Sequence, residues 1–255
     1  MAITVPIGVP IFLLVALASD NLPRIANFSL DALRMMAMVG ILHFICGRYC
    51  NYRAVKAIGA NLSGPVIQLS VLVTIVLAVL LLGETLTPLR VLGIVLVILG
   101  PATMRQATAA AAEPAAPEKR APDGLPAFRP HYAEGYVFAA LAAVAYGVSP
   151  VMLRAVVEKD GIGGSLVAGI VSYGAATVAI GLLLSWPGQL RHVLAMDRRS
   201  ATWFTSSGVF VSLSQMFFYM AVSVAPVSVV MPMLQTQLVL RYVFARIFNP
   251  HHEVF

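Results

Sequence analysis

The chain has 255 residues, of which 59% are hydrophobic and only 11% are charged. A soluble domain carries about 25% charged residues, so this chain has too little polar material to face water on all sides. Its formal charge of +6 comes mostly from basic residues at the edges of apolar segments, where they meet lipid headgroups. The composition therefore excludes an ordinary soluble domain, argues against nucleic-acid binding, and predicts a lipid bilayer as the main partner.

Long apolar segments recur along the chain. A helix crosses the hydrocarbon core, about 30 Å thick, with roughly 20 apolar residues. Hydropathy and flanking polar residues define eight segments, which predict an all-α, polytopic transmembrane helical bundle. In chain order they are Ile3–Ser19, Ala32–Ile58, Leu62–Leu82, Pro88–Met104, Gly135–Val157, Gly163–Trp186, Ala201–Ala221 and Pro226–Phe248. Residues 105–134, rich in Ala, Pro and charge, predict a flexible linker between two halves.

The two halves contain an internal repeat. A shift of 167 positions aligns Tyr52, Ala54, Val55, Pro65 and Gln68 with Tyr219, Ala221, Val222, Pro232 and Gln235. It also superposes the first three segments on the sixth, seventh and eighth, while the fourth and fifth have no partner. We therefore expect five-helix units, of which this chain lacks the first helix of one and the last helix of the other. An odd helix number inverts the second unit in the membrane, as in alternating-access carriers.

The residues that repeat also resemble a known family. The region 51–100 is similar to the second part of an EamA domain, of the drug/metabolite transporter superfamily. The resemblance is carried by Tyr52, Ala54, Pro65, Gly83-Glu84-Thr85-Leu86-Thr87, Gly93 and Gly100. The second half resembles another copy, in which Pro250-His251-His252-Glu253 replaces the Gly-Glu-Thr step. This implies a first EamA repeat in 1–104, a linker in 105–134 and a second repeat in 135–255.

The resemblance also implies a function. Members of this family have ten helices and export amino acids or other metabolites, so we expect a multi-pass plasma-membrane permease with no enzymatic activity and no cofactor. Two alternatives are a truncated, non-transporting fragment or subunit, and a membrane enzyme acting on lipid-linked substrates. The enzyme would need clustered Asp, Glu or His at the interface. Cys46-Cys50 and His251-His252-Glu253 do not have the spacing of a metal site.

The acidic residues are placed at the edges of the predicted spans. All eleven lie in loops, in the linker or near segment ends, so carboxylate-based proton coupling is not expected within these eight helices. Glu84 follows the third segment directly. We interpret it as a helix terminator facing headgroups or solvent rather than as a coupling site.

Polar side chains within the spans are the candidates for substrate binding. They are His43, Arg48, Tyr52, Gln68, Tyr146, Gln215, Tyr219, Gln235 and Arg241. Arg48 and Arg241 either line a cavity, where a positive charge favours a carboxylate or phosphate, or reach towards the interface. Gln68 and Gln235 follow prolines by one turn and are expected near mid-membrane, with helix–helix hydrogen bonding as the alternative role. Packing, or a place in the aromatic belt at the membrane interface, is the alternative role of the tyrosines.

Overall fold

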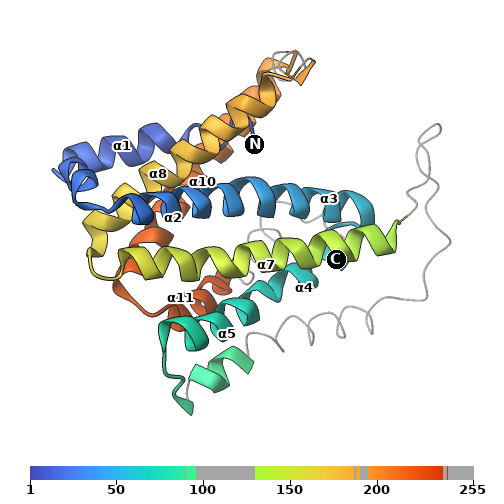
Figure 1. Ribbon diagram of the computed structural model, residues 1–255. Helices are drawn as coiled ribbons and strands as arrows, with labels where there is room; N and C mark the ends of the chain where they lie inside the picture. Colours follow the sequence, from blue (N-terminus) through green and yellow to red (C-terminus); the bar gives the residue numbers. More distant parts are fainter. Residues whose placement is uncertain (89, 96–129, 187, 190–194, 238–239, 241–255) are drawn as a thin grey trace, which may run out of the picture.

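The computed structural model describes residues 1–88, 90–95, 130–186, 188–189, 195–237 and 240. Within these ranges the chain forms helices and no strand (Figure 1). The α-helices are α1 (Gly8–Ala18), α2 (Leu30–Gly40), α3 (Arg48–Ile58), α4 (Ala60–Gln68), α5 (Ser70–Leu82), α7 (Tyr132–Val157), α8 (Gly161–Leu184), α10 (Arg198–Val224) and α11 (Val227–Leu234). A 3₁₀ helix, η1 (Leu22–Asn27), precedes α2, and a π-helix, η2 (Ile41–Gly47), joins α2 to α3.

Five helical stretches are long and apolar enough to cross a membrane. They are Leu30–Ile58, Leu62–Leu82, Tyr132–Val157, Gly161–Leu184 and Arg198–Val224. The prediction of an all-α, polytopic transmembrane bundle is therefore confirmed. The first predicted segment contains the shorter apolar helix α1, and the fourth and eighth extend outside the described residues. Helix α7 begins at Tyr132, so it includes the last three residues of the predicted linker.

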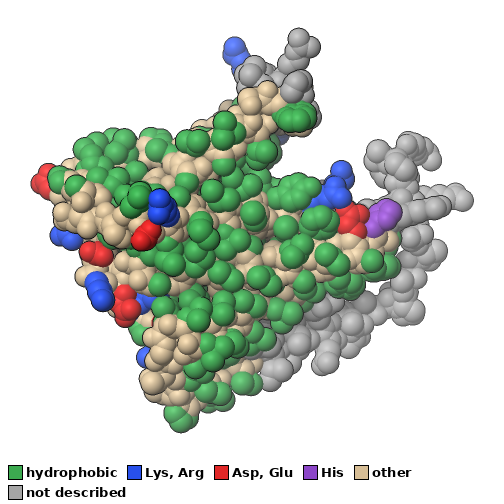
Figure 2. Space-filling model, in the orientation of Figure 1, with side chains coloured by type: hydrophobic (Ala, Val, Ile, Leu, Met, Phe, Trp, Pro, Cys, Tyr) green, Lys and Arg blue, Asp and Glu red, His purple; other side chains and the backbone are tan. Residues whose placement is uncertain are grey.

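The outer surface fits a bilayer. Hydrophobic side chains cover the middle of the face seen in Figure 2, whereas charged side chains gather at its two ends. Large apolar residues such as Leu80, Leu182 and Phe210 are 70% exposed or more. Exposure of that extent is costly in water and favourable against lipid chains.

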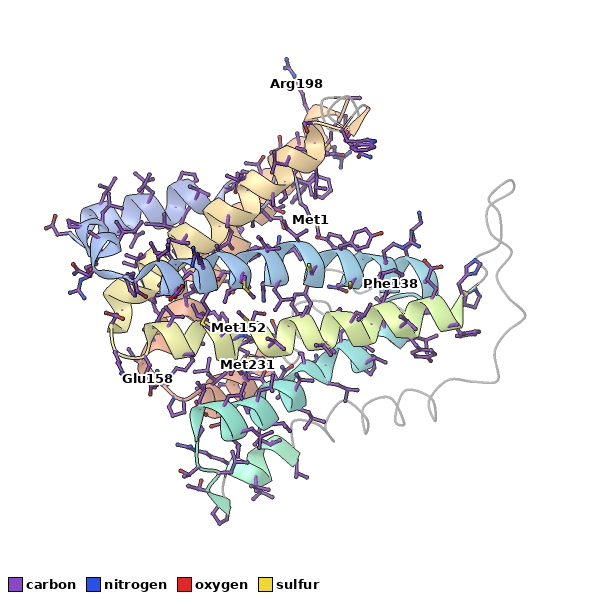
Figure 3. All side chains as sticks on the ribbon, in the orientation of Figure 1. Met1, Phe138, Met152, Glu158, Arg198 and Met231 are labelled. Atoms are coloured by element: carbon purple, nitrogen blue, oxygen red, sulfur yellow. The ribbon has the colours of Figure 1, made fainter. Side chains whose placement is uncertain are left out.

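Helix α7 lies in the middle of the bundle, between the continuous helix α2–η2–α3 and the pair α4–α5 (Figure 1). The Thr74 hydroxyl of α5 donates to the Gly147 carbonyl of α7 at 2.8 Å. In Figure 3, Phe138 marks the N-terminal part of α7 and Glu158 its C-terminal end. The N-terminal and C-terminal ends of α7 therefore mark the two ends of the bundle.

Small residues allow the helices to approach closely. A Cβ added at Gly40 of α2 would lie 2.0 Å from the carbonyl oxygen of Ser172 in α8, and the Ser172 hydroxyl donates to the Met36 carbonyl at 2.7 Å. A Cβ at Gly169 would collide with the Phe12 ring. Hydrophobic burial does not drive helices together in lipid, so close contact and interhelical hydrogen bonds hold this region.

Two prolines lie inside short helices, at positions that the predicted repeat aligns. Pro65 lies inside α4, which ends at Gln68, and Pro232 lies inside α11, which ends at Leu234. Proline removes a backbone donor and clashes with the preceding turn, so each helix breaks within a few residues. Both breaks occur beside the same cavity.

Candidate functional site

A cavity of about 540 Å³ lies between the two halves of the chain. Its polar lining consists of His43, Arg48, Asn51, Ser63, Gln68, Ser70, Tyr146, Gln215, Gln235 and Gln237. The remaining lining residues are Val55, Ala60, Gly64, Ile67, Met231 and Leu234. The lining therefore combines one cationic side chain with amides and hydroxyls, and it includes no carboxylate among the described residues.

Six of the nine residues predicted from the sequence line this cavity. They are His43, Arg48, Gln68, Tyr146, Gln215 and Gln235. They come from five separate helical regions, and the structure brings them together at one cavity. Substrate binding by these residues stays a prediction.

The other three predicted residues are not found in the lining. Tyr52 of α3 is 54% exposed and is not among the lining residues. Tyr219 is 2% exposed and packs its ring against Phe12, with ring centroids 5.8 Å apart. Tyr219 therefore has the packing role that was its alternative. Arg241 lies outside the described residues.

The local backbone explains why His43 and Arg48 reach the cavity. The π-helix Ile41–Gly47 inserts a wider turn into the long helix Leu30–Ile58, and such turns often occur at functional sites. His43 lies within this turn, and Arg48 follows it directly. The π turn shifts the register of the helix, so both side chains lie at the cavity.

Arg48 carries a charge without a carboxylate partner in the described part of the chain. Its guanidinium donates to the Thr4 hydroxyl at 3.4 Å and lies 5.2 Å from the centroid of the Phe44 ring. Neither partner neutralises the charge. An anionic group of a bound molecule would supply the missing partner through charge-assisted hydrogen bonds.

The hydrogen bonds of Ser149 fix the orientation of His43. The Ser149 hydroxyl donates to the Ala145 carbonyl at 2.7 Å, so it uses its only proton there. The contact of 3.0 Å between His43 Nδ1 and Ser149 Oγ therefore requires Nδ1 to be the donor. In the neutral ring this leaves Nε2 as an acceptor. His43 thus offers a hydrogen-bond acceptor beside the positive charge of Arg48.

Two glutamines add further unused acceptors. The Oε1 atoms of Gln215 and Gln235 are buried and have no hydrogen-bond partner among the described residues. Buried polar atoms are normally paired with protein groups, water or a ligand. The cavity therefore offers acceptors from Gln215 of α10 and from Gln235, directly after α11, in the same lining as the cation of Arg48.

Sequence reasoning missed several lining residues. Asn51 lies three positions after Arg48 on one helix, a spacing that places two side chains on the same face and gave a usable signal. Ser63, Ser70 and Gln237 gave no comparable signal, because short polar residues also occur at ordinary helix contacts.

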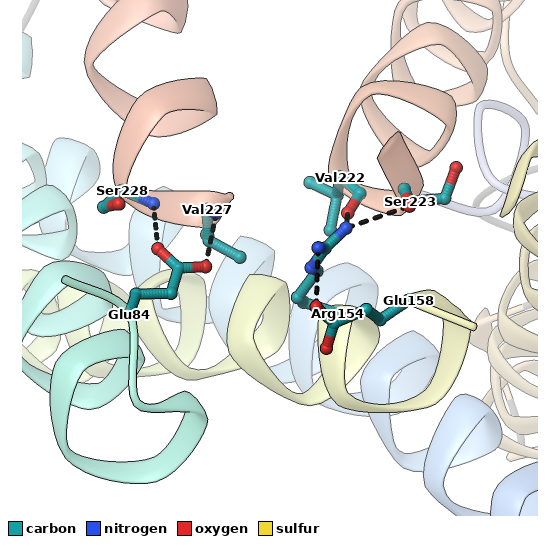
Figure 4. Close-up of polar contacts among 7 residues, drawn as sticks. All are labelled: Glu84, Arg154, Glu158, Val222, Ser223, Val227 and Ser228. Atoms are coloured by element: carbon teal, nitrogen blue, oxygen red, sulfur yellow. Dashed lines mark hydrogen bonds and ion pairs between the residues drawn. The ribbon is translucent and has the colours of Figure 1, made fainter. Parts of the chain in front are cut away.

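Glu84 has only part of the role expected from the sequence. Its two carboxylate oxygens accept hydrogen bonds from the backbone amides of Val227 at 2.8 Å and Ser228 at 2.9 Å (Figure 4). Glu84 does follow the end of α5, as expected for a helix terminator, but it binds α11 rather than facing headgroups or solvent alone. The sequence did contain one signal for this contact. Neither Ala225 nor Pro226 has a side chain that can accept from the first amides of α11, so another residue has to cap this helix.

The spanning helices and the cavity between them place this protein in the class of polytopic helical membrane proteins. Residues 1–105 match the EamA-like transporter family, and no curated protein matches the chain. The first 105 residues are thus similar to an EamA-like transporter domain, and the chain is a polytopic helical membrane protein. The matched region covers α1 to α5 and includes three of the six predicted lining residues, His43, Arg48 and Gln68.

Proposed function

We propose that this protein is a plasma-membrane permease that moves small organic solutes bearing a carboxylate or phosphate, by alternating access between two inverted halves. The observation that carries this proposal is the charge of the cavity. Arg48 contributes a cation to a lining that has no carboxylate among the described residues. A neutral or cationic solute would leave this charge unpaired in a medium where an unpaired charge is costly.

The size and chemistry of the cavity support a small ligand. Its volume of about 540 Å³ falls within the range of roughly 300–1,000 Å³ typical of small-molecule sites. The acceptors of His43, Gln215 and Gln235 suit hydrogen-bond donors on the same solute. A molecule with one anionic group and one or more N–H or O–H groups would satisfy both sides of the cavity.

The register of the broken helices supports the internal repeat. Helix α4 begins at Ala60 and α11 at Val227, a separation of 167 positions that equals the shift found in the sequence. Each helix contains a proline and is followed by a residue with ψ near −12° to −15°. Broken helices from two halves that meet at one central site are typical of inverted-repeat carriers.

Transport by purified protein in proteoliposomes tests this function. We expect uptake or counterflow of labelled carboxylates and no comparable movement of the corresponding neutral amides. Arg48→Gln should reduce transport of the acid at least tenfold, because the cation is lost while a polar side chain is kept. Arg34→Gln is the matched control, since Arg34 is exposed and pairs with Asp31 at 3.1 Å outside the cavity. Equal transport of acids and amides, or an unaffected Arg48→Gln variant, would refute the proposal.

A further inference from the structure

Two charged side chains bind the helix ends on either side of Ala225–Pro226, the two residues that join α10 to α11 (Figure 4). Arg154 of α7 donates to the carbonyls of Val222 at 2.8 Å and Ser223 at 2.9 Å, at the C-terminal end of α10. Glu84, which follows α5, accepts from the first two amides of α11. Each charge has the sign that the helix terminus favours, because the C-terminus of a helix is partially negative and the N-terminus partially positive.

We propose that Glu84 is a latch: its carboxylate holds the N-terminus of α11 against the first half of the protein, and its release lets α11 move as a gate. This inference rests on the proposed function and adds a residue that controls access to the cavity. The contact joins residues 143 and 144 positions apart in sequence, so it is made between the two halves.

The position of the latch fits a gate rather than a part of the binding site. Arg154, at the same turn, is eight residues beyond Tyr146 on α7, which corresponds to about 12 Å along the helix. The cavity lining extends the other way, through Val55 and Ala60. That region lies at the N-terminal end of α7, where the His131 amide donates to the Ala57 carbonyl at 2.9 Å. The latch therefore lies at the opposite end of the bundle from these lining residues.

The contacts around the turn identify α11 as the movable helix. Arg154 is 9% exposed, so α10 is fixed to α7 by a buried side chain that donates two hydrogen bonds to the end of α10. Its contact with Glu158 at 2.8 Å, at the end of α7, holds the guanidinium in place. In contrast, α11 is an eight-residue helix that contains Pro232 and follows two extended residues, Ala225 and Pro226. The Ala225 amide still donates to the Ala221 carbonyl, and the Pro226 carbonyl already accepts from the amides of Val229 and Val230. A change of ψ at Ala225 would therefore redirect α11 without breaking these helical hydrogen bonds.

Movement of α11 would change the cavity directly. Met231 and Leu234 on this helix and Gln235 directly after it are lining residues (Figure 3 labels Met231). Displacing the N-terminus of α11 would therefore shift one wall of the cavity and open a path towards the C-terminal end of α7. A carboxylate suits this role because its two oxygens bind two backbone amides directly, so the contact does not depend on the side chains of α11.

Accessibility of a single cysteine tests the latch without any substrate. Leu234→Cys in a Cys46→Ser, Cys50→Ser background places one thiol on the cavity wall. A membrane-impermeant thiol reagent is then added separately at each side of proteoliposomes with a known orientation. We expect Glu84→Gln to raise the labelling rate from the α7 C-terminal side about tenfold, because the neutral amide is a poorer acceptor at a helix N-terminus.

A backbone variant and a matched control separate the latch from general disturbance. Val227→Pro removes one of the two amides that Glu84 binds, at the first helical position, where proline is well accepted. It should raise labelling in the same way as Glu84→Gln. Asp160→Asn neutralises an exposed acid at the same end of the bundle and should leave labelling unchanged.

The outcomes distinguish the latch from the proposed function. Unchanged labelling in both Glu84→Gln and Val227→Pro overturns the latch, whether or not the protein transports carboxylates. Raised labelling in a protein that transports no carboxylate supports the latch and refutes the proposed function. Loss of the folded state in both variants, measured by size-exclusion chromatography, shows a purely structural cap and also overturns the latch.

Discussion

The two ends of the bundle are joined by different kinds of contact. At the N-terminal end of α7, Arg53 and Glu134 form an ion pair between side chains that are 42% and 36% exposed. At the C-terminal end, Glu84 and Arg154 bind backbone groups at helix termini instead. An exposed ion pair is weak because both charges stay solvated, whereas a charge at a helix terminus satisfies groups that the helix itself leaves unpaired. We call the end joined by the exposed Arg53–Glu134 pair the permissive end, and the end where Glu84 and Arg154 bind helix termini the controlled end.

The largest effect is expected from the buried charge at the controlled end. Arg154→Met keeps an apolar chain of similar length but leaves the Val222 and Ser223 carbonyls without their donor. We expect a loss of about 3 kcal/mol in stability, since these groups are buried and lose a charged partner. Thermal unfolding in detergent measures this loss. A change no larger than that of Arg34→Met, at an exposed arginine, would show that the two ends do not differ as described.

A middle-sized effect is expected from a site that belongs to neither end. Gly40→Ala would place a methyl group 2.0 Å from the backbone oxygen of Ser172, so α2 and α8 must move apart. Such overpacking costs about 1–3 kcal/mol, and the same thermal unfolding assay detects it. Gly174→Ala in α8 is the control, because nothing lies within 4 Å of the added carbon. Equal stability of the two variants would contradict the close packing of α2 and α8.

The smallest effect is expected at the permissive end. In a double-mutant cycle, Arg53→Ala and Glu134→Ala should show a coupling energy below about 1 kcal/mol, as for other exposed pairs. Arg53 also lies 5.3 Å from the centroid of the Phe138 ring, so Arg53→Ala alone should cost slightly more than Glu134→Ala. A coupling energy above about 2 kcal/mol would remove the proposed difference between the ends.

The sequence by itself determined where the membrane helices and their breaks lie. The predicted span Leu62–Leu82 has the same bounds as the observed one, and Pro65 and Pro232 interrupt helices that begin 167 positions apart. These features are local, because transfer of a side chain into lipid and the missing amide of proline depend on residue type alone. The same signals led to six residues of the cavity lining.

Only the tertiary structure decided which groups meet across the bundle. Hydropathy does not separate the exposed Tyr52 from the buried Tyr219, since this depends on how the helices rotate against one another. Nor does it pair Glu84 with amides 143 and 144 positions away or Arg154 with the end of α10. A helix terminus has unpaired groups that any nearby charge of the right sign can bind, so the partner is set by packing and not by local sequence.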